Sequence, residues 1–177
     1  LIHWPLPNPE YKDWKELDVE TWRGLEELYK AGKVKAIGVS NYQTHHLADL
    51  LEEAEIIPAV NQIECYPYLS QAATIQYCLE RNIRPEAWGP LGAGKSDILT
   101  NPVITEIAKK RGLTPAQVVL GWNLERGVIV IPKSIHKERL TENLKCTDFE
   151  LTDEDMTRIS ALNKNLRLGA DPDHFNF

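Results

Sequence analysis

Short apolar runs alternate with longer amphipathic stretches along most of the chain. The stretches repeat apolar residues at the spacing of one helix face, which is typical of helices packed on a core. Because each connection between successive apolar runs is then helical, the pattern predicts a parallel sheet. The runs expected to form its strands cover residues 1–3, 34–39, 59–65, 83–88 and 128–131.

Capping residues mark where several helices should begin and end. Asp18 is the expected N-cap of the first helix, and Gly32 is its expected stop. Asn101-Pro102 and Thr114-Pro115 each place proline directly after an N-cap residue, the favoured order at a helix start. Thr152–Asp155 forms a variant capping box for the last helix. From about residue 163 onward we expect an irregular tail.

Two of the expected strands have unusual sequences. Pro85 lies within the fourth run, and proline removes a donor from the ladder, so a short strand or a bulge is expected there. The fifth run, residues 128–131, is continuously apolar, which predicts a strand buried on both faces.

Composition narrows the class of protein. The 177 residues fit one domain spanning 1–177, and the net charge of −6 argues against nucleic-acid binding. No apolar run approaches the ~20 residues of a membrane span, and no signal peptide is recognisable. The three cysteines lack a CxxC pair, which favours reduced thiols in a cytoplasmic protein and no metal site. His45 and His46 are expected to face solvent.

Polar or aromatic residues follow every expected strand. They are His3, Ser40-Asn41, Gln62 with Glu64, Trp88-Gly89 and Lys133-Ser134. Strand ends that simply face water would explain any one of these positions. Five in succession instead indicate the active face of a parallel barrel, which lies at the carboxyl ends of its strands.

Four segments at these positions resemble motifs of the aldo-keto reductases. Leu1–Pro5 is similar to the family's histidine motif, and Gly38–Asn41 and Asn61–Cys65 are similar to its nicotinamide-contact motifs. Ile131–Ser134, continued to Asn143, resembles its adenosine-phosphate motif. Ala87–Gly92 points to the bacterial branch that includes diketogluconate and methylglyoxal reductases.

The resemblance implies a parallel (β/α)8 TIM barrel, of which this chain is the C-terminal portion, about four and a half β/α units. It also implies NADPH-dependent reduction of small aldehydes, ketones, α-dicarbonyls or keto sugars to alcohols. The expected partners are a small carbonyl substrate and the N-terminal part of the same barrel. The parent protein is expected to be a monomer.

On the substrate side, the resemblance assigns the catalytic role to His3 and a pocket wall to Trp4. A ring nitrogen of His3 could donate to the carbonyl oxygen, where negative charge grows during hydride transfer. A structural histidine and an ordinary core indole are the alternatives.

On the cofactor side, Ser40, Asn41 and Gln62 suit the nicotinamide carboxamide, which offers one acceptor and one NH2 group. Trp88 could stack on the nicotinamide ring. The pyrophosphate would then lie against the backbone of Gly89, Pro90, Leu91 and Gly92. Capping of strand ends by polar side chains is the alternative for the first three residues.

Two cations and a hydroxyl gather around an expected helix start in an otherwise acidic chain. Lys133, Ser134 and Arg139, with the neighbouring Ile135, are expected to bind the adenosine 2′-phosphate, which favours NADPH over NADH. The remaining residues of this motif, expected to bind adenine, are Glu142 and Asn143. A solvated basic helix face is the alternative.

The family's tyrosine acid, with its lysine and aspartate, has no counterpart here, so the isolated chain is predicted to be inactive. Two other functions stay open. One is a non-catalytic NADP(H)-binding or interaction subunit, and the other is an unrelated barrel that binds phosphate through Lys133 and Ser134.

Overall fold

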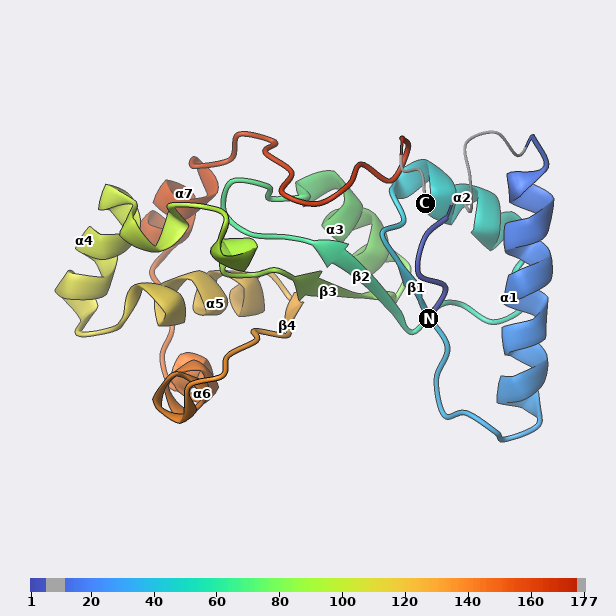
Figure 1. Cartoon of the computed structure of the whole chain (residues 1–177), viewed down its shortest axis with the longest axis horizontal. Helices are drawn as coiled ribbons and strands as arrows, with labels where there is room; N and C mark the ends of the chain where they lie inside the picture. Colours follow the sequence, from blue (N-terminus) through green and yellow to red (C-terminus); the bar gives the residue numbers. More distant parts are fainter. Residues whose placement is uncertain (6–11, 175–177) are drawn as a thin grey trace. The chain divides into compact units, whose positions relative to one another are not determined.

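The computed structural model describes residues 1–5 and 12–174, and residues 175–177 of the expected tail lie outside them (Figure 1). The chain forms two compact units. The first comprises Leu1–Ile63, Ala72–Pro85 and Gly169–Phe177, and the second comprises Glu64–Gln71 and Glu86–Leu168. A single barrel domain over residues 1–177 remains a prediction.

Helices and parallel strands alternate through the described residues, as the sequence pattern predicts. The strands are β1 (Val39–Ser40), β2 (Val60–Glu64), β3 (Arg84–Trp88) and β4 (Ile129–Val130), in the order β1-β2-β3-β4. The helices are α1 (Trp14–Lys30), α2 (Thr44–Glu53), α3 (Ala72–Glu80), α4 (Pro102–Arg111), α5 (Pro115–Glu125), α6 (Lys137–Leu144) and α7 (Asp153–Ser160). Short 3-10 turns are η1 (Gly92–Gly94), η2 (Ile98–Thr100) and η3 (Lys145–Thr147). This order confirms the parallel α/β class.

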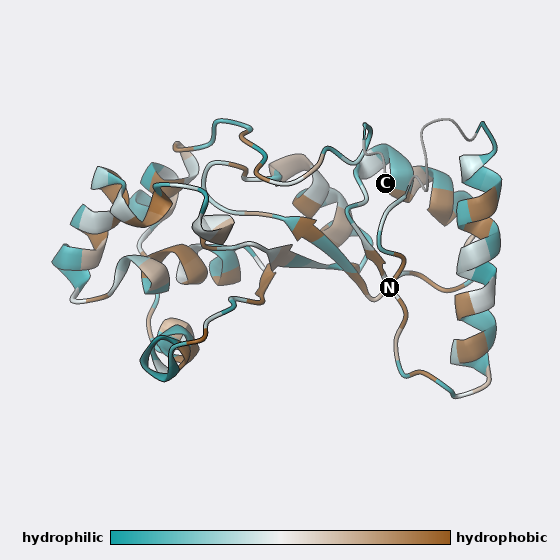
Figure 2. Cartoon of the chain, viewed as in Figure 1, coloured by the Kyte–Doolittle hydropathy of each residue, from teal (hydrophilic) through white to brown (hydrophobic). Residues whose placement is uncertain are grey.

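The core of the first unit forms where α1 and α2 pack beside strand β1. Figure 2 shows that α1 carries both hydrophobic and hydrophilic residues, as expected of a helix with one buried face. Trp22 of α1 is buried in a cluster with Val39, Leu47 and Leu50. The Trp22 indole donates a hydrogen bond to the carbonyl of Ile56 at 3.2 Å, so the buried ring keeps a polar partner.

Asp18 does not cap the first helix, so that prediction is wrong. α1 begins at Trp14, and Asp18 lies inside it, on the buried face, where its carboxylate accepts a hydrogen bond from the Tyr42 hydroxyl. A partner distant in sequence therefore determines this position. Burial raises the pKa of the Asp18 carboxyl to about 6, and the hydrogen bond from Tyr42 offsets only part of that rise.

In the second unit, the predicted helix caps are confirmed. The Asn101 side chain accepts a hydrogen bond from the Val103 amide at 2.9 Å, ahead of Pro102. Thr114 caps α5 in a reciprocal capping box with Gln117. The Thr152 hydroxyl accepts from the Asp155 amide at 3.3 Å, which begins α7. Each signal is local, so sequence alone predicts it.

The predicted strands differ from the observed ones mainly in length. β1 and β4 contain two residues each, shorter than the apolar runs 34–39 and 128–131 that predicted them. Ile129 and Ile131 are 42% and 43% exposed, which contradicts the expected burial. β4 stands last in the strand order, and burial on both faces requires covering helices and neighbouring strands. β3 spans Pro85 as a short strand, as predicted.

Asp18→Asn should change how stability depends on pH. The native carboxyl binds a proton more readily than the unfolded one, so the native state loses stability as pH rises from 3.8 through about 6. The variant keeps an oxygen for Tyr42 but cannot ionise. Its free energy of unfolding, relative to the unmodified chain, should increase by on the order of 2 kcal/mol between pH 4 and pH 7.

Urea unfolding at four pH values in this range measures the difference. His46 has a lowered pKa and gives a slope of opposite sign, but it is present in both proteins and cancels in the comparison. A difference that stays constant with pH would show that Asp18 ionises normally in the native state.

Candidate functional site

In the first unit, four predicted site residues meet where β1 ends beside the middle of β2. Ser40 and Asn41 are buried, and the Ser40 hydroxyl donates a hydrogen bond to the Gln62 carbonyl at 2.8 Å. The Asn41 side-chain amide donates to the carbonyl of His3 at 2.9 Å. Asn41 also adopts a left-handed φ of 65°, which asparagine tolerates better than most residues. The structure therefore brings His3, Ser40, Asn41 and Gln62 together.

These hydrogen bonds also support part of the capping alternative. The Ser40 hydroxyl and one Asn41 donor hold the backbone of neighbouring strand ends, so both residues have a structural role. Such bonds fix the side chains in place, and pre-positioned polar groups bind a ligand without further ordering.

His3 and Trp4 extend from the short bridge that Ile2 makes with Val39. The His3 side chain is exposed, and its ring lies 5.7 Å from the Trp4 ring, tilted by 53°. An exposed imidazole remains accessible to a ligand, as the proposed role of His3 requires. The ring pair gives this end of the strand an aromatic surface.

In the second unit, the predicted adenosine-phosphate residues line a single pocket of about 360 Å3. Lys133 and Ser134 precede α6, and the Ser134 hydroxyl accepts from the amide of His136 at 3.1 Å, at the start of that helix. Arg139 extends from the first turn of α6. The predicted residues among those lining the pocket are Leu91, Lys133, Ser134, Arg139, Glu142 and Asn143.

The charges of this pocket suit an anion on one side and a hydrogen-bonding ring on the other. Among the described residues, neither Lys133 nor Arg139 takes part in an ion pair. Glu142 is held in place, because its carboxylate accepts from the Thr114 hydroxyl at 2.6 Å. Asn143 is buried. Ile135, also predicted here, is 80% exposed and does not line the pocket.

The conformation of the turn after β3 is a further reason for the glycines found there. Gly89 and Gly92 have φ values of 61° and 76°, and the Gly92 amide donates to the Gly89 carbonyl at 2.9 Å, which closes a tight turn. A Cβ on Gly92 would lie 2.8 Å from the Ser96 Cβ. Chain geometry therefore requires glycine here, whether or not a pyrophosphate approaches. Trp88 ends β3 half-buried, and Pro90 is buried.

The cysteines are poor candidates for a nucleophile. All three are free thiols, and burial raises the pKa of Cys65 and of Cys78 to about 11. A thiol with such a pKa holds its proton at neutral pH, and the thiolate is the reactive form. Among the described residues, no helix has the length and apolarity that crossing a membrane requires.

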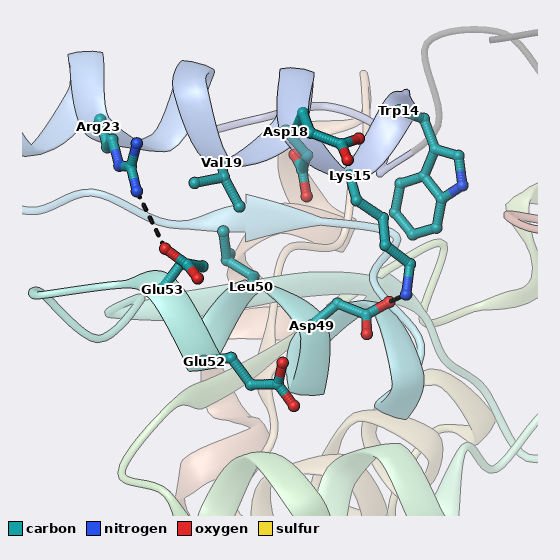
Figure 3. Close-up of a pocket in the computed structure, with 10 residues that line it drawn as sticks. Trp14, Lys15, Asp18, Val19, Arg23, Asp49, Leu50, Glu52 and Glu53 are labelled. Carbon is teal, nitrogen blue, oxygen red and sulfur yellow. Dashed lines mark hydrogen bonds and ion pairs between the residues drawn. The ribbon is translucent and has the colours of Figure 1, made fainter. Parts of the chain in front are cut away.

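Another pocket of the first unit lies between α1 and α2, with a volume of about 390 Å3 (Figure 3). Its two cations are paired, Lys15 with Asp49 at 2.6 Å and Arg23 with Glu53 at 3.0 Å. It contains no residue from the predicted site. We interpret it as a groove between two packed helices.

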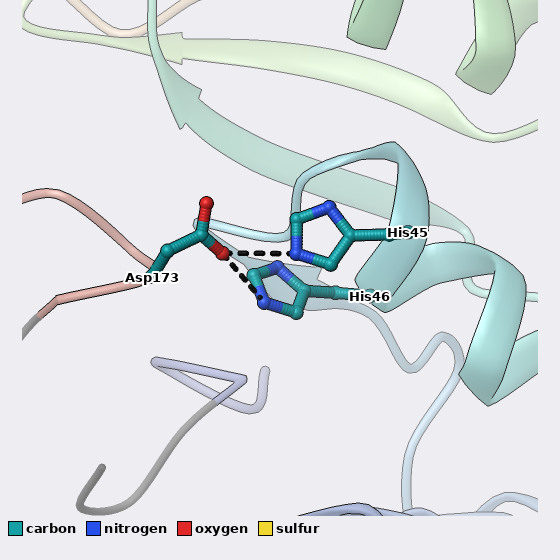
Figure 4. A group of neighbouring side chains, drawn as sticks. All are labelled: His45, His46 and Asp173. Carbon is teal, nitrogen blue, oxygen red and sulfur yellow. Dashed lines mark hydrogen bonds and ion pairs between the residues drawn. The ribbon is translucent and has the colours of Figure 1, made fainter.

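Sequence reasoning missed the surroundings of His46. The side chain is 1% exposed, so the prediction that it faces solvent is wrong, whereas His45 is exposed as expected. His46 is the third residue of α2, and its Nδ1 accepts from the Gln43 amide at 3.1 Å in a capping box. Both imidazoles also meet Asp173, far along the chain (Figure 4). The only nearby sequence feature that could have indicated this burial was the position of His46 in the capping box of α2.

Residues 1–164 match the family model described as Aldo/keto reductase family. The chain is 51% identical over 177 residues to the glyoxal reductase of Bacillus subtilis (strain 168), covering all of this chain and 60% of that protein. It is 40% identical over 175 residues to the methylglyoxal reductase DkgA of Escherichia coli (strain K12), covering 99% of this chain and 62% of that protein.

Solved structures give the same result. A Gox0644 mutant in complex with NADPH matches with a TM-score of 0.88 and 44% identity, over 99% of this chain and 62% of that one. Such a match confirms the predicted class of parallel α/β barrel fold. The chain belongs to the aldo/keto reductase family. It spans about 60% of the length of the curated relatives it matches.

Gly92→Ala should destabilise the second unit more than Gly94→Ala. Both glycines have a left-handed φ, 76° and 70°, but only at Gly92 would a Cβ meet another atom closely. The shared backbone cost is ~1 kcal/mol, and we expect the clash with Ser96 to add a further ~1–3 kcal/mol. Urea denaturation of the two variants gives the comparison. Equal losses would mean that the turn relaxes to accept a methyl group.

Proposed function

We propose that the protein containing this chain is an NADPH-dependent reductase of small aldehydes, ketones and α-dicarbonyls, active as a cytoplasmic monomer. The observation that carries the proposal is the pocket of the second unit, where the residues of the expected adenosine-phosphate motif come together. Family membership supports the reaction type. The names of the two relatives, a glyoxal and a methylglyoxal reductase, favour α-dicarbonyls as the substrate class.

In this proposal Lys133, Ser134 and Arg139 hold the 2′-phosphate of the cofactor. Two cations and a hydroxyl can make charge-assisted hydrogen bonds to a dianion, and the N-terminus of α6 adds its partial positive charge. Asn143 and the fixed carboxylate of Glu142 would face the adenine amino group. Since NADH lacks the 2′-phosphate, these contacts select NADPH.

In the first unit, Ser40, Asn41 and Gln62 are proposed to bind the nicotinamide carboxamide. The side chains of Ser40 and Asn41 and the backbone of Gln62 are already ordered by hydrogen bonds, which lowers the entropic cost of holding a ligand. Trp88 would stack on the ring, and the turn from Gly89 to Gly92 would carry the pyrophosphate. When bound, NADPH supplies the hydride that adds to the carbonyl carbon.

His3 is proposed to orient the carbonyl group by donating to its oxygen, and Trp4 to line the substrate pocket. The oxygen also needs a proton, which the family resemblance assigns to a tyrosine supported by a lysine and an aspartate. These have no counterpart in the motifs of this chain. The proposal therefore requires the remaining part of the barrel, and the 177 residues alone should not turn over substrate.

Lys133→Ala and Arg139→Ala should each weaken NADPH binding about tenfold, because each removes one charge-assisted hydrogen bond to the phosphate. NADH binding should change less than twofold. Isothermal titration calorimetry with both nucleotides measures the effect. Lys137→Ala is the matched control, because Lys137 is a basic residue of the same helix that does not line the pocket. Equal losses for NADPH and NADH would contradict the phosphate assignment.

Joining the chain to the part of the Bacillus subtilis glyoxal reductase that it does not match should restore NADPH oxidation with methylglyoxal. The isolated chain should be slower by at least about 100-fold, because it lacks the general acid. The decrease of NADPH absorbance with time gives both rates. Ordinary rates from the isolated chain would contradict the division of roles. A chimera that binds NADPH but reduces no carbonyl would favour the non-catalytic alternative.

A further inference from the structure

The tail of the first unit, residues 169–174, meets the first turn of α2 at a single carboxylate (Figure 4). One oxygen of Asp173, Oδ1, lies 2.9 Å from His45 Nε2 and 3.1 Å from His46 Nε2. The two imidazoles are adjacent in sequence, and their ring centroids are 3.9 Å apart. Residues about 128 positions apart thus form one polar cluster.

The first candidate for this cluster is a metal site. Its three possible ligand atoms lie within 4.8 Å of one another, and two imidazoles with a carboxylate are a common donor set for zinc. A metal on His46 Nε2 would need the lone pair of that nitrogen. The other ring nitrogen, Nδ1, would then carry the proton and act as a donor.

The capping box of α2 requires the opposite tautomer. The backbone amide of Gln43 donates to His46 Nδ1 at 3.1 Å, so Nδ1 must keep its lone pair. In a neutral ring the proton is then on Nε2, which faces Asp173. A metal ion and the helix cap therefore compete for His46, and the observed cap leaves the protonated Nε2 facing Asp173.

His46 is also held neutral by its surroundings. Its ring packs edge-on against Trp14 at 5.6 Å and Tyr42 at 6.0 Å. Burial and, after it, repulsion from His45 lower the pKa of His46 to about 4, and attraction to Asp173 offsets only part of this effect. The other charged groups that act on the ring are Asp49 of α2, which raises the pKa, and Lys15 of α1, which lowers it.

We propose that His45, His46 and Asp173 form a metal-free latch that fastens the tail to the first turn of α2. Asp173 is presented by a turn of its own, because its amide donates to Asp171 Oδ1 at 3.0 Å. α2 directly follows Ser40 and Asn41, so the latch fixes the tail to the segment that carries two proposed cofactor residues. The latch stands independently of the proposed function, since it concerns the fold of the first unit.

A latch made by a neutral donor differs from an ion pair in its response to pH. Deprotonation of a histidinium would release an ion pair as pH rises through the ordinary histidine range, near 6.5. Above that range the neutral Nε2–H of His46 still lies 3.1 Å from Asp173 Oδ1. The contact of His46 with Asp173 should therefore be the same at pH 6 and pH 8.

Hydrogen exchange of the amides of residues 169–174 tests the latch. Asp173→Ala should accelerate their exchange about tenfold, the equivalent of one lost charge-assisted hydrogen bond, and His45→Ala, which removes the partner in that bond, should have a similar effect. His174→Ala is the control, because this histidine of the same segment is 81% exposed in its side chain and its ring nitrogen lies 3.9 Å from Asp171 rather than against Asp173. Asp173 is 41% exposed in its side chain, so its replacement should leave the core intact.

Two further measurements separate the latch from its alternatives. The 15N shifts of His46 should show a proton on Nε2 and none on Nδ1, at pH 6 as well as at pH 8. Adding micromolar zinc should leave the melting temperature unchanged. Unchanged exchange in Asp173→Ala would overturn the latch. Stabilisation by zinc in the unmodified chain, lost in Asp173→Ala, would instead establish a metal site.

Discussion

Parallel pairing in register is the constraint that positions the candidate site residues within each unit. In the first unit Val39 pairs with Asn61 and Ser40 with Gln62, so the last residue of β1 lies beside Gln62 of β2. Only in this register can the Ser40 hydroxyl reach the Gln62 carbonyl. In the second unit, the pairing of β3 with β4 fixes in the same way the positions of Trp88 and Lys133, which follow the paired residues. A slip of one residue would turn each of these side chains to the opposite face.

Polar groups on the buried face of α1 add specificity to the packing of the first unit. Asp18, Trp22 and Glu26 lie on that face, and each has a partner outside the helix. Tyr42 donates to Asp18, and the Glu26 carboxylate accepts the backbone amides of residues 55 and 56 at 2.8 Å each. An apolar face could slide along its neighbours, whereas these directional bonds allow one position. The helix that sequence patterning treats as simply amphipathic is therefore located by hydrogen bonds.

What the sequence predicts correctly depends on how far the determining partner lies along the chain. The caps at Asn101, Thr114 and Thr152 were predictable, because donor and acceptor are within three residues. That Lys133, Ser134 and Arg139 lie together was predictable for a similar reason, since they surround a single helix start. Asp18 was assigned wrongly because Tyr42 determines its position, and His46 because Asp173 and Trp14 do. The predicted strand lengths were wrong because pairing depends on neighbouring strands, which a local pattern cannot show.

The carboxylate of Glu142 belongs both to the pocket of the second unit and to the start of α5. It accepts a hydrogen bond from the Thr114 hydroxyl, and the Gln117 side chain donates one to the Glu142 backbone carbonyl at 3.3 Å. Thr114 and Gln117 are the two members of the α5 capping box. A ligand that draws on Glu142 must share it with this helix start. Occupancy of the pocket and fraying of α5 are therefore linked equilibria, and ligand affinity includes the free energy of that helix turn.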